Sequence, residues 1–149
     1  MTQYYGLPER QVPELGARLL VNADETGPNH VVPHSAVAPR YAPDGMALLS
    51  ATYLGTRAQT DAELATETVR ALESWYPERR FDDVERLHTD RIPFAQFDQP
   101  PGIHDELPNV RAPDGSVYLA GEYTQWSSIQ GAMESGRVAA KAVLDDLSA

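Results

Sequence analysis

Between Val117 and Leu144 the sequence places residues that could bind a phosphate-bearing ligand. An apolar run is followed by a polar turn with one carboxylate, Glu122, and then by a helical pattern whose first turn is rich in small residues. The carboxylate can accept hydrogen bonds from ribose or ribityl hydroxyls. The free N–H groups of a first helical turn, at the positive end of the helix dipole, favour an anion. The segment therefore predicts a site that a pyrophosphate or a flavin carbonyl would fit.

A long helix is predicted to begin at about Ser128. Ser127, followed three residues later by Gln130, has the form of a capping box. Apolar residues at the three-and-four spacing of one helical face are expected to be buried: Ile129, Ala132, Met133, Gly136, Ala139, Ala140, Val143, Leu144 and Leu147. Gly131 and Gly136 lie inside this helix, where each costs roughly 0.8 to 1 kcal/mol relative to alanine. That cost indicates a close approach of a backbone or a ligand.

A short strand is expected before the helix. Residues 117–121 form a continuous small-to-apolar run after the turn signal at residues 113–115, which is typical of a strand buried on both faces. Glu122 then lies at the carboxyl end of the strand, where ligands bind in open α/β sheets. Ordinary packing of a strand on a helix explains the same pattern, and Glu122 is then a surface acid.

Two motifs in this segment resemble the C-terminal flavin-binding segment of the amine oxidase and phytoene desaturase superfamily of FAD-dependent oxidoreductases. There, a strand ending in Ala-Gly-Asp/Glu precedes a loop and Ser-x-x-Gly-Ala-x-x-Ser-Gly; residues 120–122 and 128–136 reproduce both. The resemblance implies FAD as cofactor, with Glu122 on the ribityl chain and Trp126 beside the flavin. It also implies that the backbone N–H groups around Ile129 to Ala132 face the flavin ring or the pyrophosphate. The cofactor-binding residues expected on this basis are Gly121, Glu122, Trp126, Ser128, Ile129, Gln130, Gly131 and Ala132. No catalytic residue or metal ligand is predicted.

The resemblance continues upstream in a weaker form. Residues 32–51 look like substrate-domain strands of phytoene desaturase-like proteins, and residues 87–95 look like the strand that returns toward the cofactor domain. We therefore expect a poorly ordered lead-in over residues 1–16, a substrate-domain-like portion over 17–112, and a C-terminal FAD-binding strand and helix over 113–149. These parts are expected to form one compact unit.

The sequence has no Gly-x-Gly-x-x-Gly turn, with which superfamily members bind the ADP half of FAD. Its ten glycines never occur at that spacing. At 149 residues the chain is also shorter than a two-domain flavoenzyme should be. We expect a C-terminal piece, or a subunit whose Rossmann half lies on another polypeptide.

The expected fold class is α+β, with a small antiparallel or mixed sheet and about two main helices. Strands are predicted at residues 18–23, 30–37, 46–53 and about 83–89. Thr60 and Glu63 form a second capping box, which opens a helix that ends just before Pro77. Residues 93–113 have the composition of a crossing loop between the substrate and cofactor portions.

Composition narrows the classes of partner. The net charge of −10 argues against a nucleic-acid groove or an anionic membrane surface. The absence of cysteine excludes disulfides and Cys-ligated metals. No apolar run approaches the roughly 18 residues of a membrane-spanning helix, and the N-terminus lacks a signal-peptide core, so a cytoplasmic protein is expected.

The histidines are better explained by ordinary structure than by a site. Pro33 lies between His30 and His34 and forbids a helical pair of metal ligands. His88 and His104 lack a Ser, Cys or carboxylate arrangement of the kind that marks a nucleophilic site.

Two classes of function remain. In the first, the chain is the C-terminal part of an FAD-dependent oxidoreductase of the amine oxidase or phytoene dehydrogenase type, inactive alone, with a small apolar or amine substrate when complete. In the second, it is a non-catalytic α+β interaction or assembly module that binds no cofactor. A truncated piece should also leave an apolar face uncovered, since the last helix and the strand at Val117 belong against an absent Rossmann sheet. This predicts self-association through that face or a partner chain, such as a Rossmann-half polypeptide.

Overall fold

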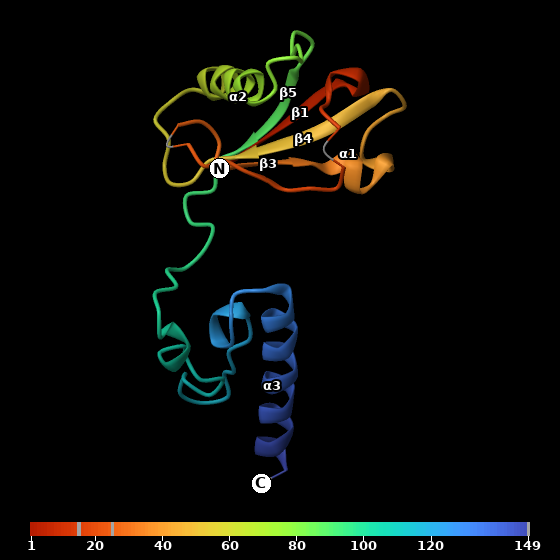
Figure 1. The fold of residues 1–149 in the computed structure, drawn as a ribbon. Helices are drawn as coiled ribbons and strands as arrows, with labels where there is room; N and C mark the ends of the chain where they lie inside the picture. Colours follow the sequence, from red (N-terminus) through yellow and green to blue (C-terminus); the bar gives the residue numbers. More distant parts are fainter. Residues whose placement is uncertain (15, 25, 149) are drawn as a thin grey trace. The chain divides into compact units, whose positions relative to one another are not determined.

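The computed structural model describes residues 1–14, 16–24 and 26–148, and the chain divides into two units, residues 1–93 and 94–149 (Figure 1). The predicted fold class, a small antiparallel sheet with helices, is confirmed. The sequence led us to expect one compact unit in which the FAD-binding part begins after residue 112. The structure instead divides between Pro93 and Phe94. The boundary lies earlier because the proline-rich segment contacts the C-terminal helix unit: the side chain of Gln96 bonds Ser127.

Residues 1–93 form an antiparallel sheet in the order β2-β3-β4-β1-β5, with α2 on one face (Figure 1). The elements of this unit are β1 (Thr2–Pro8), η1 (Glu9–Gln11), β2 (Leu20–Val21), β3 (His30–Pro33), α1 (His34–Val37), η2 (Pro39–Tyr41), β4 (Met46–Thr52), α2 (Asp61–Trp75) and β5 (Glu85–Asp90). The strands predicted near residues 46–53 and 83–89 are confirmed, and the one at 18–23 shortens to two residues. The strand predicted over 30–37 stops at Pro33, since the next four residues turn into α1.

The expectation of a poorly ordered lead-in over residues 1–16 is wrong for its first half, because β1 lies inside the sheet between β4 and β5. Thr2 pairs with Thr52 on one side and with Asp90 on the other. These partners lie far along the chain, and the local sequence, polar and interrupted by Gly6 and Pro8, gives little sign of a strand. Non-local pairing therefore determines this element.

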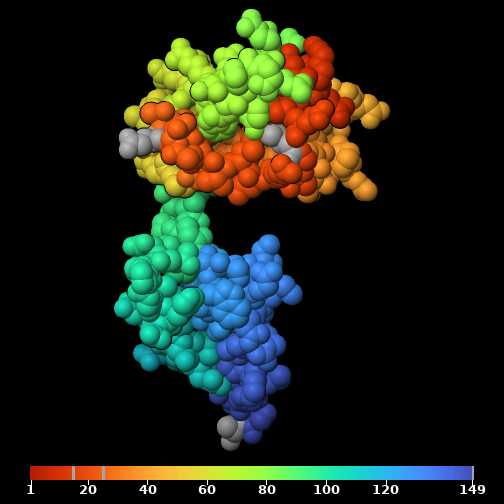
Figure 2. Space-filling model, viewed as in Figure 1, coloured from red at the N-terminus to blue at the C-terminus, as the bar shows by residue number. Residues whose placement is uncertain are grey.

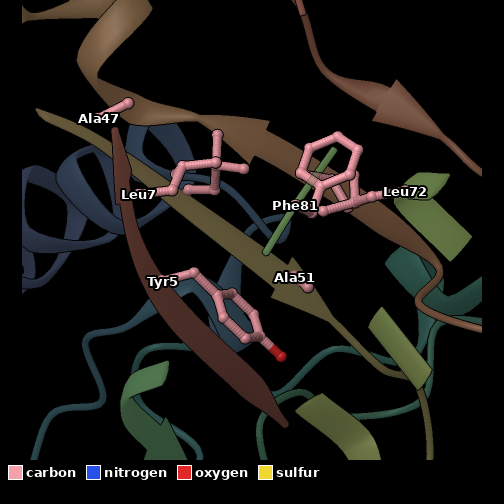
Figure 3. Packing of buried hydrophobic residues seen from close by; sticks show 8 residues of the cluster. Tyr5, Leu7, Ala47, Ala51, Leu72 and Phe81 are labelled. Atoms are coloured by element: carbon pink, nitrogen blue, oxygen red, sulfur yellow. The ribbon is translucent and has the colours of Figure 1, made fainter. Parts of the chain in front are cut away.

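The hydrophobic core of this unit lies between the sheet and α2. Tyr5 and Leu7 from β1 cluster with Leu72 of α2 and with Phe81 from the segment after it (Figure 3). The buried cluster comprises Tyr5, Leu7, Val31, Ala47, Leu49, Ala51, Leu72 and Phe81. Each fully buried leucine contributes about 1.5 to 3 kcal/mol, so this cluster holds α2 against the strands.

A buried polar network joins β1 to α2 next to this core. The Tyr5 hydroxyl donates to Oε1 of Gln3 at 2.6 Å and lies 3.0 Å from Oγ1 of Thr68. The Tyr53 hydroxyl lies 2.8 Å from the same Thr68 oxygen and 3.0 Å from the carbonyl oxygen of Leu64. Burial raises the pKa of both tyrosines, that of Tyr53 to about 12. The network lets Gln3, which has no exposed surface, lie inside the protein at little cost.

The start of α2 follows the predicted capping box. Thr60 is the N-cap, and its hydroxyl oxygen accepts from the backbone N–H of Glu63 at 3.3 Å. The Glu63 carboxylate in turn accepts from the backbone N–H of Thr60 at 2.8 Å. Both reciprocal bonds are present, and the prediction is confirmed.

Residues 94–148 contain η3 (Ile103–Asp105), η4 (Glu122–Thr124) and α3 (Ile129–Leu147). The prediction of a strand over residues 117–121 is wrong, because that segment forms no strand. Its Leu119 N–H donates to the carbonyl oxygen of Val110 at 2.9 Å, and that single bond makes no ladder. A strand needs a neighbouring strand, and the described residues of this unit contain none.

Helix α3 is buried mostly on a different face from the one that its apolar spacing predicts. Of the residues predicted to be buried, Ala139 is buried and Val143 is half-buried, and the others are exposed. Within the chain the buried positions of α3 are small residues: Gly131, Ser135, Ala139 and Ala142. The side chains of Ile129, Met133, Leu144 and Leu147 are instead between 64% and 81% exposed. Figure 2 shows the blue helix at the surface of its unit, with the preceding segment along one side. Periodicity identifies an apolar face but not the element that covers it.

The far end of α3 is tied to the segment before it by an ion pair. The Arg111 guanidinium donates to both carboxylate oxygens of Asp146 at 2.9 Å, and the Tyr118 hydroxyl donates to one of them at 2.9 Å. These contacts, with the Arg111 hydrogen bond first among them, hold the pKa of Asp146 below its ordinary value. The small-residue face of α3 is thereby held against residues 110–118.

Candidate functional site

The residues predicted to contact a cofactor lie together in the loop before α3 and in its first turn. Gly121 begins the loop with a φ of +155°, and a Cβ there would lie 2.3 Å from the ring of Tyr123. Its backbone N–H donates to Oγ of Ser135 in α3 at 2.8 Å. Glycine is the residue that fits this position, because other residues rarely adopt such a φ and their Cβ would clash with the Tyr123 ring.

Glu122 is the first residue of η4 and is half-buried. Its Oε2 accepts a hydrogen bond from the Ser127 hydroxyl at 2.9 Å. The oxygen of that hydroxyl also accepts from Nε2 of Gln96. The carboxylate is therefore held within its own unit by a neighbouring loop residue.

The N-cap of α3 is Ser128, whose Oγ accepts from the N–H of Gly131 at 2.8 Å. The capping box predicted from Ser127 and Gln130 is therefore wrong by one residue, although the predicted helix start is right. Ser127 makes other bonds: its hydroxyl donates to Glu122, and its oxygen accepts from Gln96.

The packing of the loop explains why residue 131 is glycine. A Cβ at this position would lie 1.9 Å from the carbonyl oxygen of Trp126, so the loop backbone crosses the helix where only glycine leaves room. A Cβ at Gly136 would have no described atom within 4 Å. The protein backbone therefore makes the inferred close approach at Gly131, and none of the described residues makes it at Gly136.

The first turn of α3 keeps two donors for another group. The N–H groups of Gly131 and Ala132 bond Oγ and the carbonyl oxygen of Ser128. Among the described residues, no acceptor meets the N–H groups of Ile129 and Gln130, as expected at a helix start. Two of the four predicted backbone donors are therefore used internally and two remain.

The surface around these donors is partly aromatic. Trp126 is 41% exposed, Tyr123 is 39% exposed, and Gln130 and Ala132 are also exposed. One carboxylate, two backbone donors and an exposed indole thus lie within one loop and one helical turn. This set can hold a ligand that has hydroxyl groups, a carbonyl or phosphate oxygen, and a flat ring.

Several residues of this site were not predicted. Ser135 is part of the second quoted motif, whose last serine could have indicated the contact to Gly121. Gln96 and Ser127 carry no such signal, because one is a glutamine in a proline-rich stretch and the other had been assigned to the helix cap. His104, whose Nδ1 lies 3.3 Å from the carbonyl oxygen of Gln125, likewise contacts the loop.

The other histidines lie in the sheet unit. Nε2 of His34 lies 2.8 Å from Oγ of Ser50, and Nε2 of His88 lies 3.0 Å from Oδ1 of Asp90. Nδ1 of His30 lies 3.0 Å from the side-chain nitrogen of its neighbour Asn29. Each has a polar partner that accounts for it without a ligand.

Comparison with known proteins gives two matches. The family model for flavin-containing amine oxidoreductases matches residues 6–144. A 15-cis-phytoene desaturase of Solanum lycopersicum, described as chloroplastic/chromoplastic, is 28% identical over 96 residues, which are 59% of this chain and 16% of that protein. The chain thus spans only a small part of this relative's length. Across the described residues, no helix combines the length and apolar character needed to cross a membrane.

Proposed function

The chain belongs to the flavin-containing amine oxidoreductase family, and from this premise we propose that residues 94–148 supply part of the FAD site of an oxidoreductase. Residues 1–93 supply part of its substrate-binding domain. The observation that carries the proposal is the grouping of Glu122, Trp126 and the free N–H groups of Ile129 and Gln130 at the start of α3. The substrate we propose is a small apolar or amine compound, the two kinds that the family's name and the relative's name suggest.

The chemical character of this group supports a flavin as its ligand. The Glu122 carboxylate accepts from a ribityl hydroxyl, since a carboxylate is an acceptor only. The N–H groups of Ile129 and Gln130 donate to a flavin carbonyl or a pyrophosphate oxygen, with help from the helix dipole. Trp126 offers a flat surface beside the ring. When bound, the flavin supplies hydride and electron transfer, and the protein binds and orients it.

These residues are proposed to be insufficient for activity without further FAD contacts. The 149 residues contain no Gly-x-Gly-x-x-Gly turn, so the ADP half of FAD has none of its usual contacts among them. The purified chain should therefore be colourless, without stoichiometric flavin in its visible absorption spectrum. A yellow protein with one flavin per chain would contradict this part of the proposal.

Weak binding of a smaller flavin tests the site itself. NMR titration of the full chain with FMN should shift the Trp126 indole signal, and Glu122→Ala should weaken FMN binding by about tenfold, the loss of one hydrogen bond to a charged group. The matched control is Glu106→Ala, because Glu106 is an exposed acid of the same unit whose carboxylate bonds none of the described residues. Equal loss in both variants would contradict a role for Glu122.

The exposed apolar stripe of α3, defined by Ile129, Met133, Leu144 and Leu147, supports a partner for this helix. We propose that a Rossmann-half polypeptide or a second copy of the chain covers it. Met133→Gln with Leu144→Gln should then reduce association in sedimentation velocity, while Leu54→Gln, another exposed apolar side chain, should not. A wild-type chain that stays monomeric over a wide concentration range would count against self-association.

The same stripe also favours the alternative function, a non-catalytic assembly module that binds no cofactor. The two functions differ in one observable. A chain that associates through α3 but gives no FMN-induced shift at Trp126 is an assembly module; a chain that responds to FMN belongs to a flavin site.

A further inference from the structure

The carboxylate of Glu122 is held by a chain of two hydrogen bonds that begins in the proline-rich segment. Gln96 donates through Nε2 to Oγ of Ser127, and Ser127 donates to Oε2 of Glu122 at 2.9 Å. Ser127 and Glu122 are half-buried, which shields the second bond from water. Gln96 thus bonds Ser127, which lies 31 positions later in the chain, and through it is linked to the predicted cofactor site.

The chemistry of the three groups fixes the direction of both bonds. A carboxylate only accepts, so the one hydroxyl hydrogen of Ser127 must point to Glu122. The Ser127 oxygen is then left to accept, which requires the amide nitrogen of Gln96, not its oxygen, to face it. Flipping the Gln96 amide would leave two acceptors competing for one hydrogen.

This direction leaves one oxygen of Glu122 for a ligand. The hydrogen bonds made by the described residues engage only Oε2, so Oε1 is available to accept. Its position follows from the orientation that Ser127 imposes on the carboxylate. Without Ser127 the carboxylate is free to rotate about its last side-chain bond, because terminal sp³–sp² torsions are broad.

We propose that Gln96 and Ser127 are positioning residues that orient Glu122 so that Oε1 accepts from a ribityl hydroxyl. This inference rests on the function proposed above. It gives the proline-rich segment a role in flavin recognition that its sequence does not suggest. Gln96 does not touch the ligand and acts through Ser127.

The hydrogen-bond chain can be tested without any flavin. In the ¹⁵N-labelled full chain, Ser127→Ala should move the side-chain amide signals of Gln96, because their acceptor is lost. Ser127→Thr should keep them near the wild-type position, because threonine retains the hydroxyl. Unchanged Gln96 signals in Ser127→Ala would overturn the inference while leaving the proposed function standing.

The consequence for binding is tested with two flavins that differ in the ribityl chain. FMN carries it, and lumiflavin has a methyl group in its place. Ser127→Ala and Gln96→Leu should each weaken FMN binding by about three- to tenfold and leave lumiflavin binding within about twofold. Gln99→Leu is the matched control, since Gln99 is an exposed amide of the same segment that bonds none of the described side chains.

The outcomes separate the two proposals. Equal weakening of FMN and lumiflavin indicates a general structural effect and overturns the positioning role. Normal binding of both flavins by Ser127→Ala and Gln96→Leu overturns it as well. A wild-type chain that responds to neither flavin contradicts the proposed function, and this inference falls with it.

Discussion

Replacing Tyr5 by phenylalanine should destabilise residues 1–93 more than replacing Tyr53 by phenylalanine, although both rings are buried and both hydroxyls bond Thr68. The difference comes from what each hydroxyl leaves behind. Tyr5 supplies the only hydrogen that reaches Oε1 of Gln3 among the described residues, and Gln3 has no exposed surface. Tyr53 donates to the Leu64 carbonyl, which also accepts the ordinary helical bond within α2.

The magnitudes follow from these two situations. A buried acceptor left without a donor costs about 1 to 3 kcal/mol, so Tyr5→Phe should lose this amount. A carbonyl that keeps one of its two bonds loses only the net value of a hydrogen bond, about 0.5 to 1.5 kcal/mol for Tyr53→Phe. Urea slopes of about 1 kcal/mol/M for small domains turn the larger loss into a midpoint about 1 to 3 M lower.

The assay is urea unfolding of the full chain followed by tryptophan fluorescence. A Trp126→Phe background leaves Trp75, at the end of α2, as the only tryptophan, so the signal reports on residues 1–93. The double variant Tyr5→Phe with Tyr53→Phe completes a cycle that measures coupling through Thr68. A loss for Tyr53→Phe equal to or larger than that for Tyr5→Phe would refute the argument from unsatisfied acceptors.

Three further predictions follow from the geometry. Burial raises the folded-state pKa of Tyr53 from 10.0 to about 12. The neutral phenol therefore stabilises the fold fully below pH 10, and this stability is lost as the pH rises toward 12. Urea midpoints should fall over that range. Arg111 lowers the folded-state pKa of Asp146. The ionised carboxylate therefore stabilises the fold above its ordinary pKa, and this stability is lost as the pH falls through the folded-state pKa. Asp146→Asn should flatten the acid limb of a Trp126 fluorescence titration, and an unchanged limb would contradict this. Gly131→Ala should lower the melting temperature, because its Cβ meets a carbonyl oxygen at 1.9 Å, whereas Gly136→Ala, which meets nothing, should stabilise α3 by about 0.5 to 1 kcal/mol.

Local signals in the sequence predicted local structure well. The capping box at Thr60 and Glu63 predicted the start of α2, and both of its bonds are present. The apolar spacing predicted α3 and the β4 strand. These elements depend on residues within a few positions of each other.

Elements that depend on distant partners were predicted less well. The polar sequence of β1 gave little sign of a strand whose partners lie at residues 46–52 and 85–90. Residues 117–121 look like a strand, but the described residues of their unit contain no strand for them to pair with. The stripe on α3 was identified, but spacing alone could not tell that small residues on another face are the ones buried within the chain.

The predicted site residues lie together because they are neighbours in the sequence. Their grouping could therefore be predicted without knowledge of long-range contacts. What the sequence did not reveal is how they are held. Gly121 and Gly131 are required by Tyr123 and by the Trp126 carbonyl, and these contacts depend on the path of the loop. The role of Gln96 depends on a contact across a proline-rich segment that has no regular periodicity.

The position of β1 also bears on how the chain folds during synthesis. This strand is synthesised before both of its neighbours in the sheet, which end at Thr52 and Asp90. The centre of the sheet therefore cannot close until nearly all of residues 1–93 have emerged, and such late, long-range closure slows folding. Until β5 is made, the edge of β1 that pairs with it stays unpaired, so the nascent chain is most vulnerable to mispairing before that point.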